Sequence, residues 1–168
     1  KTGTLTEGRP HLARVVPLNG HEADALLAMA AAVEQRSEHP LARAVVEAAE
    51  ARGLTLPPVR DFEALAGLGV AARVGGRHVQ IGRPAFLAEQ GVPVPEEQVT
   101  ALAAEGHTVV AVAVDGVPAG LLALTDTIRP SAEPAIRALH RMGRRVAMIT
   151  GDSEAAARAV ARRLGIDE

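Results

Sequence analysis

The stretch Thr108–Leu124, TVVAVAVDGVPAGLLAL, decides the fold because it lies in the most apolar part of the chain. A helix that crosses a bilayer needs ~20 apolar residues without interruption. Here Asp115, Gly116 and Pro118 break the run in its middle, and Asp-Gly between two apolar runs is a strong hairpin signal. The pattern therefore predicts a buried β-hairpin and excludes a membrane-spanning helix at this place.

Short strand-like runs before this hairpin extend the predicted antiparallel sheet. Residues 59–65, 69–74 and 78–82 have strand composition, and Gly75-Gly76 is placed to turn between the last two. Apolar residues at helical spacing predict two helices that meet at the corner 37–40, where Pro40 suits a first helical turn. The predicted helices cover residues 23–36, 37–53, 83–91, 95–106, 131–142 and 153–164.

The last third of the chain alternates helix and strand, which is typical of a doubly wound α/β unit. The segment Arg145–Thr150, RVAMIT, is nearly all apolar, as expected for a parallel strand covered on both faces. We therefore expect one domain inserted into another. Residues 1–9 and 126–168 would form an incomplete α/β unit, and residues 10–125 an α+β unit with an antiparallel sheet flanked by helices.

Composition excludes several classes of site. The formal net charge is −2, with acids and bases interspersed, which argues against a nucleic-acid partner because such binding needs a basic face. Cysteine is absent, so the chain has no disulfide, no thiolate zinc site and no cysteine nucleophile. Aromatic residues make up only 1%, so alanine, leucine and valine must build the core.

The loop after the predicted strand 145–150 is a candidate phosphate site. It carries Thr150, Gly151 and Asp152, and a helix is predicted to begin directly after them. Free N–H groups at a helix start, a glycine that permits close approach and a threonine hydroxyl together suit a phosphate. Ligands of open α/β sheets gather at such strand ends. The alternative is that Asp152 or Ser153 only caps the helix.

The opening loop, KTGTLT, offers a second set of hydroxyls. Thr2 and Thr4 lie on either side of Gly3, but a Ser/Thr/Gly loop alone is an unspecific signal. If this loop faced the loop with Thr150 and Asp152, the two together would form a pocket for a phosphoryl group and Mg²⁺.

Taken jointly, five segments resemble the heavy-metal-transporting (class IB) P-type ATPases. In chain order they are KTGTLTEG, SEHPLA, AGLGV with the later IGR, DTIRP, and MITGD. The resemblance runs along the whole chain. It implies a nucleotide-binding domain inserted into part of a haloacid-dehalogenase-like phosphorylation domain, and the binding of ATP and Mg²⁺.

The resemblance also implies which residues carry the phosphoryl transfer. The nucleophile would be an aspartate directly before Lys1, which accepts the γ-phosphoryl group as an aspartyl phosphate. It is not in this chain, so we expect the chain alone to be inactive. The corresponding catalytic positions present here are Lys1, Thr2, Thr4, Thr150, Gly151 and Asp152. The backbone carbonyl of Thr2 would bind Mg²⁺, and Asp126 and Arg129 would form a hinge or a salt-bridged linker.

For the nucleotide, the resemblance points to the corner 37–40 and to several glycines. His39 would lie against the purine ring, unless it only caps a helix or packs at the corner. Glu34 would accept a hydrogen from the amino group of adenine, unless it is only a solvated helix-end carboxylate. Glycines without a Cβ would let the backbone approach the ligand closely. These glycines are Gly67, Gly69 and Gly82.

For the parent protein, the resemblance implies a translocase that couples ATP hydrolysis to the transport of a heavy-metal cation. Copper is slightly favoured over zinc or cadmium by the phrases PLNG, MGRRVAMITGD and LGID. This chain would be a cytoplasmic part of an integral membrane protein, with the membrane helices, the actuator domain and the ligands of the transported metal elsewhere in the polypeptide. Two alternatives stay open: a soluble haloacid-dehalogenase-type phosphohydrolase with an inserted domain, and a nucleotide-binding module without catalysis.

Overall fold

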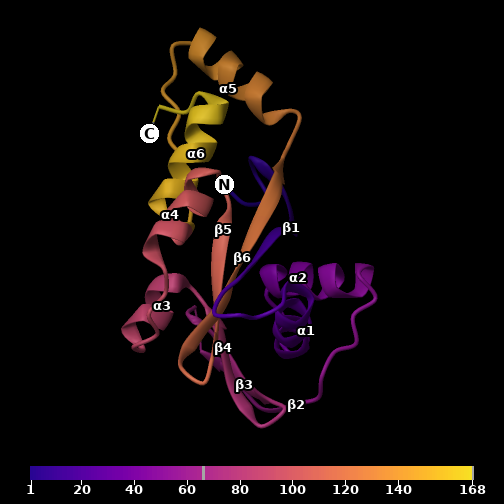
Figure 1. Ribbon diagram of the computed structural model, residues 1–168. Coiled ribbons are helices and arrows are strands. Elements are labelled where there is room, and N and C mark those ends of the chain that lie inside the picture. The colour runs from indigo at the N-terminus through magenta and orange to yellow at the C-terminus, as the bar shows by residue number, and fades with distance from the viewer. Residues whose placement is uncertain (66, 168) are drawn as a thin grey trace.

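A six-stranded sheet forms the centre of the protein in a computed structural model, which describes residues 1–65 and 67–167 (Figure 1). The strand order is β1-β6-β5-β4-β3-β2, and each neighbouring pair is antiparallel. The strands are Thr6–Pro17 (β1), Val59–Leu65 (β2), Gly69–Val74 (β3), Arg77–Gly82 (β4), Thr108–Val114 (β5) and Val117–Ile128 (β6). The helices are Ala23–Glu34 (α1), Pro40–Ala51 (α2), Pro84–Glu89 (α3), Glu96–Ala104 (α4), Ala132–Arg141 (α5) and Glu154–Leu164 (α6).

The predicted hairpin between β5 and β6 is confirmed. Asp115 and Gly116 have φ angles of 51° and 78°, and positive φ at both central residues is what a tight turn matched to the twist of a hairpin requires. The Asp115 carboxylate accepts hydrogen bonds from the His78 N–H at 2.8 Å and from the Arg77 Nε at 3.0 Å. These bonds hold the pKa of Asp115 below its ordinary value and tie the turn to β4.

Helices cover both faces of this hairpin, which explains its continuous apolar sequence. Val112 and Leu122 belong to the core cluster shared with α1 and α2. Their neighbours Ala111 and Leu121 point to the opposite face, where they pack in a cluster with residues of α3 and α4. Figure 1 shows α1 and α2 on one side of the sheet and α3 and α4 on the other. Because successive side chains of a strand alternate between faces, both faces of β5 and β6 must be apolar.

The edge strand β1 was not predicted from the sequence. It pairs with β6 from Thr6↔Ile128 to Pro17↔Gly120. Its outer residues are largely polar and exposed, and it contains Pro10, which an edge strand tolerates. The expected domain boundaries at 9/10 and 125/126 fall inside β1 and β6, whose ladder continues across both positions. The division into domains stays a prediction.

The predicted parallel strand at 145–150 is wrong. These residues have no β pairing, and Ile149 is 90% exposed. A parallel strand needs a parallel neighbour, and the strands formed by the described residues are all paired antiparallel. The nearby helices α5 and α6 pack on each other instead, through a small cluster that includes Ile136, Val160 and Leu164. Within residues 1–65 and 67–167, no helix is both long and apolar enough to cross a bilayer.

We predict that Gly69→Ala destabilises the protein, because β3 and β4 pair Gly69 directly with Gly82. A Cβ at Gly69 would stand 2.2 Å from the carbonyl oxygen of Ile81, so the two strands would have to separate. We expect urea denaturation to show a loss of about 2 kcal/mol or more in the free energy of unfolding. Gly151→Ala is the control, since a Cβ there meets no atom within 4 Å. Equal stability of the two variants would contradict the prediction.

Candidate functional site

The corner between α1 and α2 is built by local sequence signals. Pro40 opens α2, and the ring of His39 caps this helix by accepting a hydrogen bond on Nδ1 from the Leu41 N–H at 3.2 Å. Capping of this kind satisfies a backbone donor that the first helical turn leaves without a partner. The Ser37 hydroxyl in turn accepts a hydrogen bond from the His39 N–H at 3.4 Å. Hydrogen bonds of Ser37 and His39 therefore stabilise the short connection between α1 and α2.

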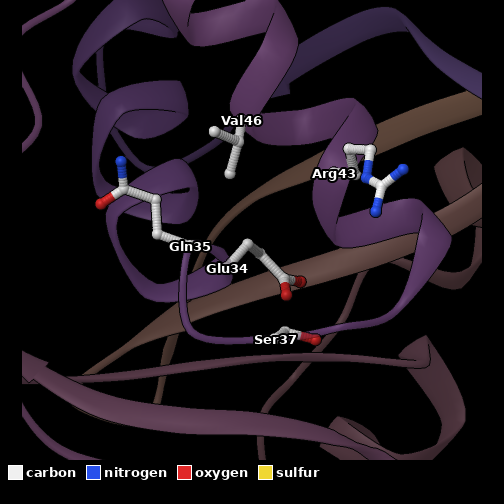
Figure 2. Close-up of a pocket in the computed structure, with 5 residues that line it drawn as sticks. All are labelled: Glu34, Gln35, Ser37, Arg43 and Val46. Atoms are coloured by element: carbon white, nitrogen blue, oxygen red, sulfur yellow. The ribbon is translucent and has the colours of Figure 1, made fainter.

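A hollow of about 190 Å³ opens beside this corner. Figure 2 shows the Glu34 carboxyl group pointing into the space between Ser37 and Arg43. Gln35 and Val46 complete the lining. The hollow thus offers a carboxyl group, a guanidinium group and a hydroxyl around one small space, with an apolar contact from α2.

Glu34 is the most unusual group of the hollow, because it is an acidic side chain that is only 9% exposed. Desolvation by burial raises the pKa of Glu34 from 4.5 to about 7, and a side-chain hydrogen bond with Ser37 partly opposes this rise. Burying a carboxylate without a cation is costly. The ion pairs found among the described residues do not include Glu34.

The other residues expected at a nucleotide site are not among those that line the hollow. His39 is exposed at the start of α2. Gly67 has a φ of 72° and lies between β2 and β3. Gly69 and Gly82 face each other across the β3–β4 ladder, where a side chain on either would collide with the backbone of the other strand. These two glycines therefore have a steric role inside the sheet, and their role beside a ligand stays a prediction.

The structure brings the opening loop and the loop after residue 149 together. The Lys1 ammonium group forms an ion pair with the Asp152 carboxylate, and their side chains are only 5% and 17% exposed. The Thr150 hydroxyl donates to Asp152 Oδ2 at 3.3 Å. The cap of α6 comes from Ser153, which accepts a hydrogen bond from the Ala156 N–H at 3.4 Å. Asp152 is therefore engaged with Lys1, whereas Ser153 caps the helix.

Two further threonines take part in this arrangement, and sequence reasoning missed both. Thr108, at the start of β5, donates from its hydroxyl to Asp152 Oδ1 at 3.1 Å. Thr6 is 1% exposed and donates to Asp126 Oδ2 at 2.5 Å. The only sequence signal for Thr6 is its place in the KTGTLT run, and Thr108 has none beyond its position at a strand start.

Asp126 and Arg129 fasten the opening loop to β6. Besides the Thr6 hydroxyl, Asp126 accepts the N–H of Arg9 at 3.1 Å. Arg129 donates from Nε to the Thr6 carbonyl at 2.9 Å and from Nη2 to the Gly3 carbonyl at 3.2 Å. Among the described residues, Asp126 and Arg129 do not form an ion pair with each other, so the expected salt-bridged linker is not observed. Each residue instead forms its own hydrogen bonds with the beginning of the chain.

The fit of Mg²⁺ to these loops is partial. Thr2 and Thr4 are exposed, but the Asp152 carboxylate is already paired with Lys1. The described ranges contain no group of three or more His, Cys, Asp or Glu side chains that could hold a metal ion. Since Mg²⁺ usually keeps waters and substrate phosphates among its ligands, the loops fit an ion that arrives with a nucleotide.

Comparison with known proteins gives consistent matches over the whole chain. The profile of haloacid dehalogenase-like hydrolases matches residues 1–168. The chain is 46% identical to Copper-transporting ATPase 1 of Rhizobium meliloti (strain 1021) and 43% identical to the Silver exporting P-type ATPase of Salmonella typhimurium, covering all of this chain and 21% of each relative. The chain thus spans about a fifth of the length of these relatives.

Solved structures give the same picture. The crystal structure of a zinc-transporting PIB-type ATPase in the E2.Pi state matches 99% of this chain and 27% of that chain, with a TM-score of 0.76 and 37% identity. The catalytic domain of the CPx-ATPase CopB-B, described for its conformational changes on nucleotide binding, matches with a TM-score of 0.72 and 27% identity. That match covers all of this chain and 57% of the other.

We predict that Glu34→Gln changes how stability depends on pH. Because burial raises the pKa of Glu34 to about 7, its contribution to the free energy of unfolding is fully present below the unfolded pKa and is lost as the pH rises through about 7. At about pH 8.5 the variant should be more stable than the wild type, by on the order of 3 kcal/mol. Urea denaturation across the pH range measures this, and stability curves that run parallel for the two proteins would contradict it.

We predict strong coupling between Thr6 and Asp126. Asp126→Ala leaves the buried Thr6 hydroxyl with only the Lys1 carbonyl, 3.5 Å away, as an acceptor, so it should lower the free energy of unfolding by about 1–3 kcal/mol. Thr6→Val removes the hydroxyl together with its need for a partner. In a double-mutant cycle the coupling energy should therefore exceed ~1 kcal/mol. Additive effects of the two substitutions would show that the short hydrogen bond contributes nothing to stability.

Proposed function

Because this chain belongs to the haloacid dehalogenase-like hydrolase family, and is similar over its whole length to metal-transporting P-type ATPases, we propose that it is the ATP-binding part of such a pump. In this proposal it lies on the cytoplasmic side, and the membrane helices and the actuator domain belong to the rest of the same polypeptide. The observation that carries the proposal is the open hollow at the α1–α2 corner, with Glu34 pointing into it (Figure 2).

The adenine end of the nucleotide is proposed to bind at this corner. The hollow presents Val46 and the polar groups of Glu34 and Ser37, which suits a flat, mostly apolar ring with a polar edge. His39 is exposed next to the hollow, so its ring can contact the purine without moving a packed side chain. Gly67 would allow the turn between β2 and β3 to approach the ligand.

The phosphate end is proposed to reach the loops that meet at Lys1 and Asp152. Catalysis of phosphoryl transfer is mainly positioning and charge stabilisation. The Lys1 ammonium group would face the transferred phosphoryl group, held there by Asp152, while the hydroxyls of Thr4 and Thr150 and the N–H of Gly151 donate hydrogen bonds. When bound, Mg²⁺ would neutralise phosphate charge, with the Thr2 carbonyl as a ligand.

The acceptor in this proposal is an aspartate directly before Lys1. A polypeptide limited to residues 1–168 does not contain it, so we propose that such a polypeptide binds nucleotide without forming a phosphoenzyme. The cargo of the whole protein is proposed to be a heavy-metal cation. Copper is favoured, because several of the similar proteins are named as copper-transporting.

The two alternatives, a soluble phosphohydrolase and a non-catalytic nucleotide module, gain less support. Both are compatible with the antiparallel sheet and with the Lys1–Asp152 contact. The similar proteins that match across all of this chain include copper and silver transporters, and the solved structures include a zinc transporter. These matches favour the pump.

We predict that ATP binds at the α1–α2 corner. In an ATP titration followed by amide chemical shifts, the signals of residues 34–41 and 67–69 should move together. His39→Ala should abolish the response, since it removes the ring proposed to contact the purine. His11→Ala is the matched control, because His11 is an exposed histidine on β1 and its substitution should leave the response unchanged. Unchanged binding by the His39→Ala protein would contradict the proposed site.

A further inference from the structure

The surroundings of Glu34 make its charged form unfavourable. Its side chain is buried at the end of α1 and points into the hollow (Figure 2). Its polar neighbour there is Ser37, whose side chain makes a hydrogen bond with it. A ligand that filled the hollow would remove the remaining water from the carboxyl group, and desolvation penalises the charged form.

The charged groups near Glu34 do not compensate for this penalty. From α2, Arg43 lines the same hollow, yet the ion pairs of the described residues do not join it to Glu34. Arg36, just after α1, instead donates to the carbonyl of Val59 at 3.3 Å. The strands β1, β2 and β3 pack against α1 but contribute no residue to the lining of the hollow.

The hydrogen-bonding edge of adenine favours a neutral partner. Its 6-amino group is a donor, and the adjacent ring nitrogen N1 is an acceptor. An ionised carboxylate has acceptors only, whereas a protonated carboxyl group has one O–H donor and further acceptor capacity. A carboxylate could satisfy the amino group, but its second oxygen would meet the lone pair of N1. The neutral acid satisfies both atoms.

We propose that Glu34 binds adenine as a neutral carboxylic acid, donating its O–H to N1 and accepting a hydrogen from the 6-amino group on its carbonyl oxygen. This inference rests on the proposed function, because it concerns the same site. No bond between heavy atoms changes in this step. Where Glu34 is ionised before binding, its carboxylate takes up one proton from solvent and forms the O–H bond. Adenine binding therefore weakens as the pH rises.

The pKa of Glu34 is consistent with this role. Burial raises it to about 7, so near neutral pH both forms of the free protein are populated. Binding that selects the neutral form draws in about half a proton at that pH. A carboxyl group with an ordinary pKa would be almost fully ionised there, and selecting its neutral form would cost much more.

The test compares the wild type with Glu34→Gln, using ADP as the ligand and calorimetry from about pH 6 to about pH 9. Wild-type affinity should fall by about tenfold or more across this range, since the neutral fraction falls about a hundredfold. The glutamine amide has an N–H donor and a C=O acceptor at every pH, so the variant should not show this fall. His39, Arg43 and the ADP phosphates are the same in both proteins, so the ratio of the two affinities isolates Glu34.

Two further measurements sharpen the test. Calorimetry in buffers of different ionisation enthalpy should show about half a proton taken up near pH 7 by the wild type and less by Glu34→Gln. The analogue 1-deaza-ADP, which lacks N1, should bind the wild type more weakly at about pH 6 and lose most of the pH dependence that distinguishes the wild type from the variant.

The outcomes separate this inference from the function on which it rests. If ADP binds, but the wild type gains affinity relative to Glu34→Gln as the pH rises, the carboxylate is the binding form and the inference is overturned. A ratio that does not change with pH overturns it as well, while the nucleotide site stands. If neither protein binds ADP at any pH, the proposed function fails, and the inference fails with it.

Discussion

The pairing of β1 with β6 is the constraint on which the rest of the structure depends. At one end of this ladder, Thr6 lies opposite Ile128. The opening loop is fastened there by hydrogen bonds to Asp126 of β6 and to Arg129, just after β6. At the other end, a Cβ on Gly120 would stand 2.2 Å from the side chain of Leu26 in α1, so α1 packs closely on β6. One strand pair thus positions the loop that holds Lys1 and the helix that ends in Glu34.

The loops around Lys1 and Asp152 and the α1–α2 corner differ in whether their buried charged groups are paired. At the loops, the Lys1–Asp152 ion pair and the hydroxyls of Thr108 and Thr150 satisfy one another, which suits a site that must hold charged groups in fixed positions. At the α1–α2 corner, Glu34 is buried without an ion pair within the described part of the chain. A buried group with a shifted pKa in a hollow is typical of a functional site. Here the proposed ligand, adenine, can form hydrogen bonds with the Glu34 carboxyl group.

Local signals in the sequence predicted many of the helices and strands, but few of the contacts between residues far apart in the sequence. Both glycine-containing hairpins and the proline-started helix α2 follow from residues next to one another. The segment 145–150 was predicted wrongly, because its apolar pattern indicates a strand but cannot show whether a parallel neighbour exists. The hydrogen bond between Thr6 and Asp126 joins residues 120 positions apart, and no local pattern reports such a contact. The burial of Glu34 was also unpredictable, because a carboxylate at a helix end is usually solvated.

The central claim is that the hollow beside the α1–α2 corner receives an adenine ring. Intermolecular nuclear Overhauser effects between the H2 and H8 protons of bound ADP and the protein test this claim most directly. Our account predicts contacts from these protons to the side chains of Val46 and Ser37, which line the hollow. Contacts from the adenine protons to the Lys1 or Thr150 loops, with none to the hollow, would contradict it.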